Sequence, residues 1–142
     1  MKAISIKQPF AGLIATGKKR LEIRSWETDY RGPLLICASL NIHEKMDSYH
    51  FKSELLKLDN KSSVSEVKIN RAFLRQGVAL CVVDLVGVGP FFAGTKASID
   101  ACIDWIPSQK AWELENVRLI EPFSVKGKLR LFEVDDSLIK FL

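Results

Sequence analysis

The sequence predicts an α+β fold: a small, mostly antiparallel β-barrel or strongly curved sheet, with a short helix after the first strand and an inserted helical segment. Segments with strand patterning outnumber helical ones, and most of them are separated by short connections. The few crossover helices argue against a doubly wound parallel sheet. A chain of 142 residues is long enough for one hydrophobic core. We therefore expect a single domain over residues 1–142.

The first quarter of the chain is expected to form a strand, a short helix and a second strand. Residues 3–7 alternate apolar and polar side chains, as a half-buried strand does. Pro9 suits the start of a helix, and Gly17 is a typical helix end. Residues 19–26 alternate again, so their apolar and charged side chains are expected on opposite faces.

The rest of the chain is expected to contain a buried strand, a helical segment and three further strands. A turn at residues 31–33 precedes the buried strand, which covers residues 34–38. Residues 41–76 have the capping pairs and apolar spacing of helices, and we predict that they are an insertion between core strands. The later strands are expected at 78–88, 112–120 and 128–134, with a short closing helix from residue 135.

Composition and charge restrict the class of protein. The apolar run at residues 78–83 is too short for a membrane span, and the start of the chain lacks the apolar stretch of a signal peptide. We therefore expect a cytoplasmic protein without a membrane partner. The net charge is +4, and residues 1–31 hold seven bases against three acids. This local excess favours an anionic partner, although a solvated rim of lysines and arginines would have the same composition.

Polar side chains that could bind a ligand crowd into residues 8–26. Gln8 precedes the proline at the helix start, where glutamine is a poor cap, so its amide is expected to face a ligand rather than lie simply exposed. Glu22 and Arg24 lie two positions apart on one strand face, and together they could read a base edge or hold a phosphate. If the pair is merely exposed, it contributes little. Trp26 is expected either to stack on a base or to cover the wall of the fold.

Signatures of metal and cofactor sites are missing from the sequence. The two histidines are seven residues apart, and no His-x-x-x-His or Cys-x-x-Cys spacing occurs. The three cysteines are widely spaced, which indicates neither a disulfide framework nor a zinc site. Gly87 and Gly89 lead into two phenylalanines rather than into a helix, unlike a phosphate-binding loop. We expect neither a metal nor a cofactor.

Two groups of residues are similar to a known family. The first consists of Gln-Pro-Phe-Ala-x-Leu-Ile at 8–14, Gly-x-Lys-x-x-Glu-x-Arg at 17–24, and Arg-Gly at 31–32. The second consists of Trp112, Asn-Val-Arg at 116–118, Glu-Pro-Phe at 121–123, Lys-Gly at 126–127, and Leu-Phe-Glu-Val at 131–134. In these motifs the chain resembles the ASCH domain, a branch of the PUA-like superfamily. The resemblance covers nearly the whole chain, with residues 41–76 as an insertion.

The resemblance implies a small β-barrel with a basic cleft near the first helix and second strand, and a role related to RNA. Members are proposed to bind RNA or nucleotides, whereas some relatives are amidohydrolases that deacetylate acetylcytidine and another is reported to be a ribonuclease. Lys19 matches the catalytic lysine of the amidohydrolases, but Glu22 stands where they have a nucleophilic threonine. Asp100 or Asp104 would have to supply their acidic proton donor. A carboxylate is a weak acyl acceptor, and beside Lys19 it favours the protonated amine, which opposes a general base.

We therefore expect an RNA- or nucleotide-binding protein that recognises its ligand in a basic cleft. The residues expected to bind the ligand are Gln8, Lys18, Lys19, Glu22, Arg24, Trp26, Arg31 and Ser39. The alternative is a hydrolase, either an acetylcytidine-type amidohydrolase or a ribonuclease, in which Lys19 and Glu22 would be catalytic. A second alternative is a non-catalytic protein-interaction module in which the Glu22–Arg24 pair only braces the fold.

Overall fold

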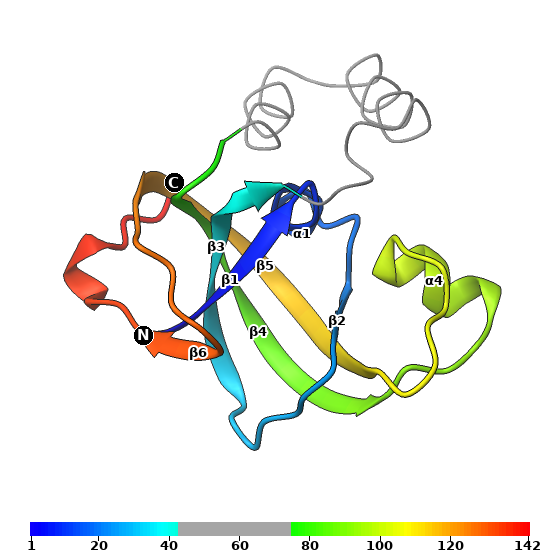
Figure 1. Ribbon diagram of the computed structural model, residues 1–142. Coiled ribbons are helices and arrows are strands. Elements are labelled where there is room, and N and C mark those ends of the chain that lie inside the picture. Colours follow the sequence, from blue (N-terminus) through cyan, green and yellow to red (C-terminus); the bar gives the residue numbers. More distant parts are fainter. Residues whose placement is uncertain (43–74) are drawn as a thin grey trace, which may run out of the picture.

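The computed structural model describes residues 1–42 and 75–142, which form one mixed sheet with short helices. The strands are β1 (Lys2–Gln8), β2 (Leu21–Arg24), β3 (Gly32–Ile42), β4 (Val78–Pro90), β5 (Lys110–Ser124) and β6 (Leu131–Glu133). The helical elements are α1 (Phe10–Ala15), α4 (Thr95–Ala101) and a 3-10 turn at Asp136–Leu138. The strand order across the sheet is β2-β5-β4-β3-β1-β6 (Figure 1). All neighbouring strands are antiparallel except β1 and β3, which run parallel.

The sheet is open, so the expected closed β-barrel is wrong. The edge strands β2 and β6 have four and three residues, and within the described residues no ladder joins them. Closure needs two edges that can form a continuous ladder, and these edges are too short for one. The sheet is nevertheless strongly curved, because the β4–β5 pairing shifts register at three places and such bulges bend and twist a strand pair (Figure 1).

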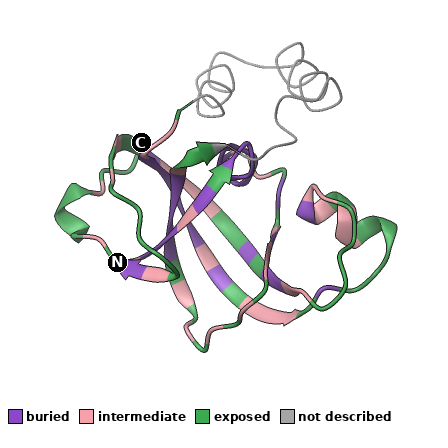
Figure 2. Cartoon of the chain, viewed as in Figure 1, coloured by how far each residue is buried: buried purple, intermediate pink, exposed green. Residues whose placement is uncertain are grey.

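The helix α1 packs inside the curve of the sheet and forms much of its core. Its sequence, Phe-Ala-Gly-Leu-Ile-Ala, is apolar on every side, and all six residues are buried (Figure 2). A helix that is apolar all round must be covered on all sides. It belongs to one core cluster with Ile4 of β1, Ile36 of β3 and the fully buried Trp112 of β5. The predicted first strand and short helix are confirmed, and the core holds them next to β2.

The structure differs from the prediction in the bounds of the strands, and it contains one helix that was not predicted. The strand expected at residues 34–38 continues to Ile42, so residues 41 and 42 belong to β3 rather than to the predicted helical insertion. Residues 43–74 of that predicted insertion lie outside the described residues. The helix α4 was not expected. None of the helices within 1–42 and 75–142 is long and apolar enough to cross a bilayer.

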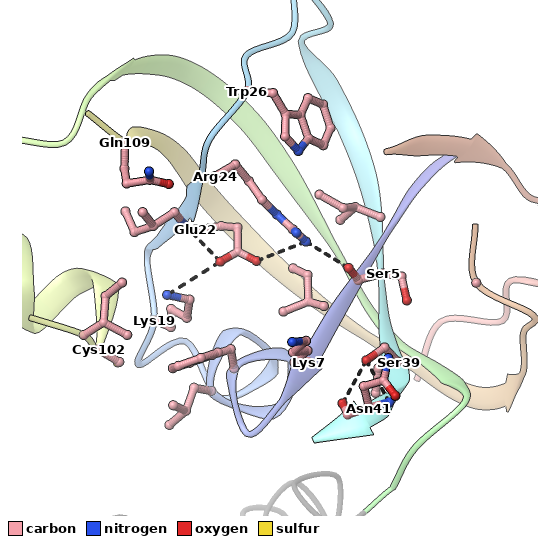
Figure 3. A pocket seen from close by; sticks show the side chains of 18 of the residues that line it. Ser5, Lys7, Lys19, Glu22, Arg24, Trp26, Ser39, Asn41, Cys102 and Gln109 are labelled. Carbon is pink, nitrogen blue, oxygen red and sulfur yellow. Dashed lines mark hydrogen bonds and ion pairs between the residues drawn. The ribbon is translucent and has the colours of Figure 1, made fainter. Parts of the chain in front are cut away.

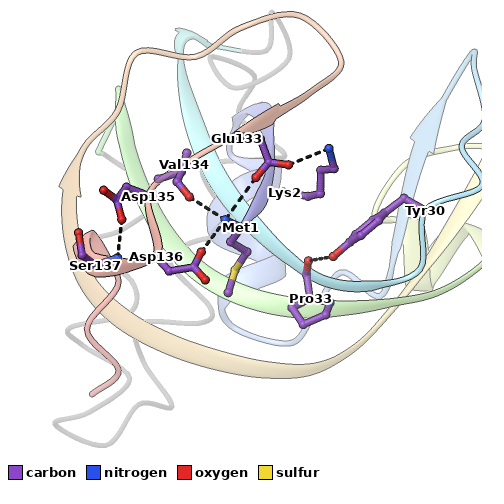
Figure 4. A network of polar contacts seen from close by, with 9 residues as sticks. All are labelled: Met1, Lys2, Tyr30, Pro33, Glu133, Val134, Asp135, Asp136 and Ser137. Atoms are coloured by element: carbon purple, nitrogen blue, oxygen red, sulfur yellow. Dashed lines mark hydrogen bonds and ion pairs between the residues drawn. The ribbon is translucent and has the colours of Figure 1, made fainter.

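A network of exposed charges joins the start of β1 to β6 and to the 3-10 turn (Figure 4). The Met1 amino group donates to the Val134 carbonyl oxygen at 2.7 Å and to Asp136 Oδ1 at 2.5 Å. Lys2 Nζ lies 2.7 Å from Glu133 Oε1. We call these residues the terminal charge network. Because β6 pairs only with residues 2–4 of β1, the second half of β1 is left to border the site described next.

Candidate ligand-binding groove

A solvent-open groove lies beside α1, where β2 and the second half of β1 face each other without pairing (Figure 3). Ser5 and Lys7 of β1 and Glu22 and Arg24 of β2 line it. Parts of α1, the end of β3, α4 with the segment after it, and the connection at residues 125–130 also line the groove. The groove therefore occupies the place at which a closed barrel would have joined its edges.

Three charged residues from neighbouring sequence positions form a chain along the floor of the groove. Lys19 Nζ lies 3.8 Å from Glu22 Oε1, and Arg24 Nη2 lies 3.7 Å from Glu22 Oε2 (Figure 3). The Arg24 Nη2 group also donates to the Ser5 carbonyl oxygen at 2.8 Å, which connects β2 with β1. We call Lys19, Glu22 and Arg24 the buried charge chain. Two of its members, Lys19 and Glu22, are only 2% and 6% exposed.

The turn between α1 and β2 explains how Lys19 becomes buried. Gly17 adopts φ +79°, a left-handed conformation that glycine tolerates best, and ends the helix. The Lys19 amide then donates to the Leu13 carbonyl oxygen at 3.0 Å, which folds the turn back onto α1. The Lys19 side chain passes 4.9 Å from the centre of the Phe10 ring and donates to the Ala101 carbonyl oxygen at the end of α4.

Burial changes the protonation behaviour of Lys19. Desolvation is the largest cause and lowers the pKa of this amine below its ordinary value, while the nearby Glu22 carboxylate acts in the opposite direction. The expectation that Glu22 would hold Lys19 in its protonated form therefore needs correction. The sequence identifies the neighbouring charge but not the burial that opposes it, because Lys19 becomes enclosed only when α1 and the end of α4 lie beside it in the fold.

Arg24 has hydrogen-bonding capacity that the described residues do not use. Its Nε atom is buried and has no hydrogen-bond partner among them. Both contacts of the buried charge chain to Glu22 are longer than an ordinary hydrogen bond, so they are ion pairs without close donor–acceptor geometry. Buried donors without a hydrogen-bond partner are rare in proteins. The side chain of Arg24 is itself 26% exposed, so it is within reach of the groove.

Trp26 lies on the wall of the groove, held by another tryptophan. Its ring meets Trp112 edge-on, with 4.7 Å between ring centroids and an interplanar angle of 82°. Trp112 Nε1 also donates to the Trp26 carbonyl oxygen at 3.2 Å. The guanidinium of Arg130 lies 5.0 Å from the centre of the Trp26 ring, a distance typical of a cation–π contact. Trp26 therefore packs against the core and also lines the groove, while its stacking on a base stays a prediction.

Two further residues predicted to bind the ligand also line the groove, at its margins. Lys18 is exposed in the turn after α1. Ser39 is half-buried on β3, where its hydroxyl donates to the Asn41 carbonyl oxygen at 2.9 Å. Five residues predicted from the second strand and the turn before it therefore meet with Ser39 of β3 around one space. They are Lys18, Lys19, Glu22, Arg24 and Trp26.

Gln8 is not among the residues that line the groove. Its side chain is fully buried, its Oε1 accepts a hydrogen bond from the Gly12 amide at 3.0 Å, and its Nε2 donates to the Arg75 carbonyl oxygen at 2.7 Å. The amide therefore satisfies one of the free N–H groups in the first turn of α1 and fastens the chain where it re-enters the sheet. Glutamine is a poor cap at the N-cap position, but the Gln8 side chain caps α1 from one residue earlier, because Pro9 is the N-cap residue.

Arg31 also lies away from the groove lining. It is exposed, and its Nη1 donates to the carbonyl oxygens of Thr28 at 2.7 Å and Tyr30 at 2.8 Å. Arg31 thus braces the turn that leads into β3.

The structure adds cations to the groove that the sequence analysis did not assign. Seven cationic side chains and two carboxylates line it among the described residues. The cations are Lys7, Lys18, Lys19, Arg24, Lys126, Lys128 and Arg130, and the carboxylates are Glu22 and Asp104. The contribution of residues 126–130 was missed because acids nearby in the sequence balance it. In the fold two of those acids, Glu133 and Asp136, belong to the terminal charge network instead.

Comparisons with known proteins identify the family. The family model described as ASCH domain matches residues 4–124, most of the chain. The chain belongs to the ASCH domain family. The family expected from the sequence motifs is thereby confirmed. Among curated proteins none matches the chain.

Solved structures support the same fold for this ASCH domain. It is similar to two variants of the Zymomonas mobilis protein ZmASCH, one with serine replaced by alanine and one with tyrosine replaced by phenylalanine. Both give a TM-score of 0.53 and cover 98% of this chain, with 14% and 13% sequence identity. The matches cover 96% and 98% of the respective ZmASCH chains. At this identity the likeness supports the fold alone.

The donor set of the groove suits an anionic or hydrogen-bonding ligand. Among the described residues, no group of three or more His, Cys, Asp or Glu side chains is placed to hold a metal ion. The groove of this ASCH domain instead offers a planar guanidinium, a carboxylate acceptor, several ammonium groups and an aromatic ring. These groups can bind a base by stacking and hydrogen bonds while ammonium groups meet phosphates.

Proposed function

We propose that this ASCH domain binds RNA, or a nucleotide-like ligand, with an unpaired base held in the groove. The observation that carries the proposal is that the buried charge chain, the Trp26 ring and an excess of cationic side chains line the same groove. Membership of the ASCH family, which is associated with RNA-related binding or hydrolysis, supports this choice.

Each member of the site has a chemical role in this proposal. Trp26 offers an aromatic face for stacking, which contributes roughly 1–3 kcal/mol per base. Glu22 accepts from the base edge, and Arg24 donates to the base or to a phosphate through the exposed part of its guanidinium. RNA suits this arrangement because single-stranded bases can leave their stack and enter a protein groove.

The test removes the Arg24 guanidinium and compares the loss of RNA affinity with the loss caused by the same substitution at an arginine outside the groove. Arg24→Ala is expected to weaken binding of a fluorescein-labelled single-stranded RNA about tenfold, since a hydrogen bond to a charged group contributes about 1.5–3 kcal/mol. Fluorescence anisotropy measures the affinity. Arg118→Ala is the control, because Arg118 is also paired with a carboxylate, Asp84, but does not line the groove. Equal losses in both variants would indicate diffuse charge attraction and contradict the proposed site.

A hydrolase is the second candidate, and the lowered pKa of Lys19 favours it. A lysine whose neutral form is more accessible can take a proton as a general base. Asp104 lines the same groove and could act as the acid, whereas Asp100 is not among the lining residues. The test is to incubate the protein with acetylcytidine and with short RNA and to follow acetate release or cleavage products. Turnover that is lost in Lys19→Met would make the domain an enzyme; absence of turnover with intact RNA binding favours the binding role.

The remaining expectations on organisation and location stay proposals. We propose a single domain over residues 1–142 and a cytoplasmic location. Limited proteolysis and fractionation of cells that express the protein test them directly.

A further inference from the structure

We propose that residues 125–130 bind the sugar-phosphate backbone of single-stranded RNA, so that the groove takes an oligonucleotide rather than a single nucleotide. We call this segment the basic loop; it connects β5 and β6. The inference rests on the proposed function, because it extends the ligand beyond the base at Trp26. It assigns a role to Lys126 and Lys128, which the base-binding site does not use.

The basic loop is held against the groove at three points. Its first residue, Val125, donates its amide to the Gly77 carbonyl oxygen at 2.9 Å. At Gly127 the loop touches β1 so closely that a Cβ atom would lie 2.7 Å from Ser5 Oγ. At its end, the Arg130 guanidinium reaches the Trp26 ring. The loop is therefore placed by the fold rather than by its own lysines.

The backbone of Arg130 indicates that its position is imposed by these contacts. Arg130 has φ +58°, in the left-handed region that residues other than glycine rarely adopt. Such a conformation persists where surrounding contacts stabilise it. The guanidinium over Trp26 is one such contact, and it brings the loop across from β6 to the β2 side of the groove.

The lysines on either side of Gly127 are available for phosphates. Lys126 and Lys128 are exposed and line the groove, and neither makes an ion pair within the described residues. The nearby Glu133, which could have neutralised them, is paired with Lys2. Asp104 is the carboxylate that shares the groove with Glu22, and it comes from the α4 side. Two unpaired ammonium groups beside a stacking residue are the arrangement expected for backbone contacts of a single strand.

The test compares an oligonucleotide with a mononucleotide. The variant Lys126→Ala/Lys128→Ala is measured against Lys96→Ala/Lys140→Ala, which removes the same charge from exposed lysines that do not line the groove. The probes are UMP, followed by calorimetry, and a labelled oligouridylate of about ten nucleotides, within the usual site size for single strands. For the oligonucleotide, the logarithm of the association constant is expected to fall linearly with the logarithm of the salt concentration. The loop variant should make this dependence less steep by about 1.4, because each of the two lost phosphate contacts contributes about 0.7. The affinity of the loop variant for UMP is expected to equal that of the unmodified protein. The control variant is expected to equal the unmodified protein with both probes.

A second variant tests placement without changing charge. Gly127→Ala puts a methyl group against Ser5 and should displace the loop, so oligonucleotide binding weakens although both lysines remain. Circular dichroism confirms that the variant is folded. If RNA binds in an Arg24-dependent way but both loop variants behave like the control, this inference is wrong and the proposed function stands. If neither probe binds the unmodified protein, the proposed function fails, and the inference fails with it.

Discussion

The terminal charge network and the buried charge chain place similar charges in opposite surroundings (Figures 3 and 4). In the terminal network, Lys2 and Glu133 approach to 2.7 Å, and the Glu133 side chain is 64% exposed. In the buried chain, Lys19 and Glu22 are 3.8 Å apart with side chains only 1% and 8% exposed. The exposed pair of Lys2 and Glu133 therefore has the shorter nitrogen–oxygen distance. A short distance matters more for the buried pair, because water does not solvate its charges.

The pKa directions express the same difference. The hydrogen bond from Lys2 lowers the pKa of Glu133, which favours the charged carboxylate. Burial lowers the pKa of Lys19, which disfavours the charged amine. The buried cations have close partners of another kind, because Lys19 donates to the Ala101 carbonyl oxygen and Arg24 donates to the Ser5 carbonyl oxygen. The terminal charge network therefore joins opposite charges of exposed side chains at close range, whereas the buried charge chain makes its short contacts with backbone oxygens.

The largest expected effect comes from removing the carboxylate between the two buried cations. Glu22→Gln leaves Lys19 and Arg24 without a counter-charge, and we expect the free energy of unfolding to fall by about 3 kcal/mol. Glu133→Gln, its exposed counterpart, should change stability little. Urea denaturation of both variants measures the difference. Equal stabilities would mean that burial does not separate the two networks.

An intermediate effect is expected in the pH dependence of stability. The pKa of Lys19 is lower in the folded than in the unfolded protein, so the unfolded state binds more protons between these two values. The contribution of Lys19 to stability therefore increases as the pH rises from the folded pKa towards the unfolded value near 10.5. The unfolding free energy of the unmodified protein minus that of Lys19→Met should rise over this interval. A constant difference across the interval would contradict the proposed desolvation.

The smallest effect concerns salt. A double-mutant cycle on Lys2 and Glu133 is expected to give a small coupling energy that disappears in about 1 M NaCl, where charges are screened within about 3 Å. The cycle on Glu22 and Arg24 should keep most of its coupling, because Glu22 is shielded from solvent ions. Thermal unfolding at two salt concentrations measures both. Loss of both couplings in salt would show that the groove floor is as accessible as the surface.

Elements with local signals were predictable, and those without them were not. Alternation at residues 3–7 and the Pro9 to Gly17 spacing correctly indicate β1 and α1. The helix α4 lacks such a signal: Gly94, the residue before its first turn, provides no side-chain cap, and Ala101 is the one buried residue of the helix. Sheet closure was predicted wrongly, because it depends on how many residues the edge strands pair, which local alternation does not report.

In the candidate site too, contacts between residues close in the sequence were predictable, whereas contacts between distant residues were not. Lys19, Glu22 and Arg24 lie within six positions, so strand parity and a glycine turn place them together. The direction of Gln8 depends on Arg75, and the basic loop lies about a hundred residues from β2, beyond any local pattern. Residues 43–74 are outside the described part, so the predicted helices there stay a prediction.

Amino-acid order alone specifies the family motif, the order of the first elements and the charged face of β2, because these depend on neighbours within a few residues. Tertiary packing decides that the sheet stays open, that Lys126 and Lys128 join the groove, and that Lys19 is desolvated. Burial and long-range electrostatics depend on which distant atoms exclude water from a charge. Lys19 is buried only in the folded chain, which places its amine beside Phe10 of α1 and beside the end of α4.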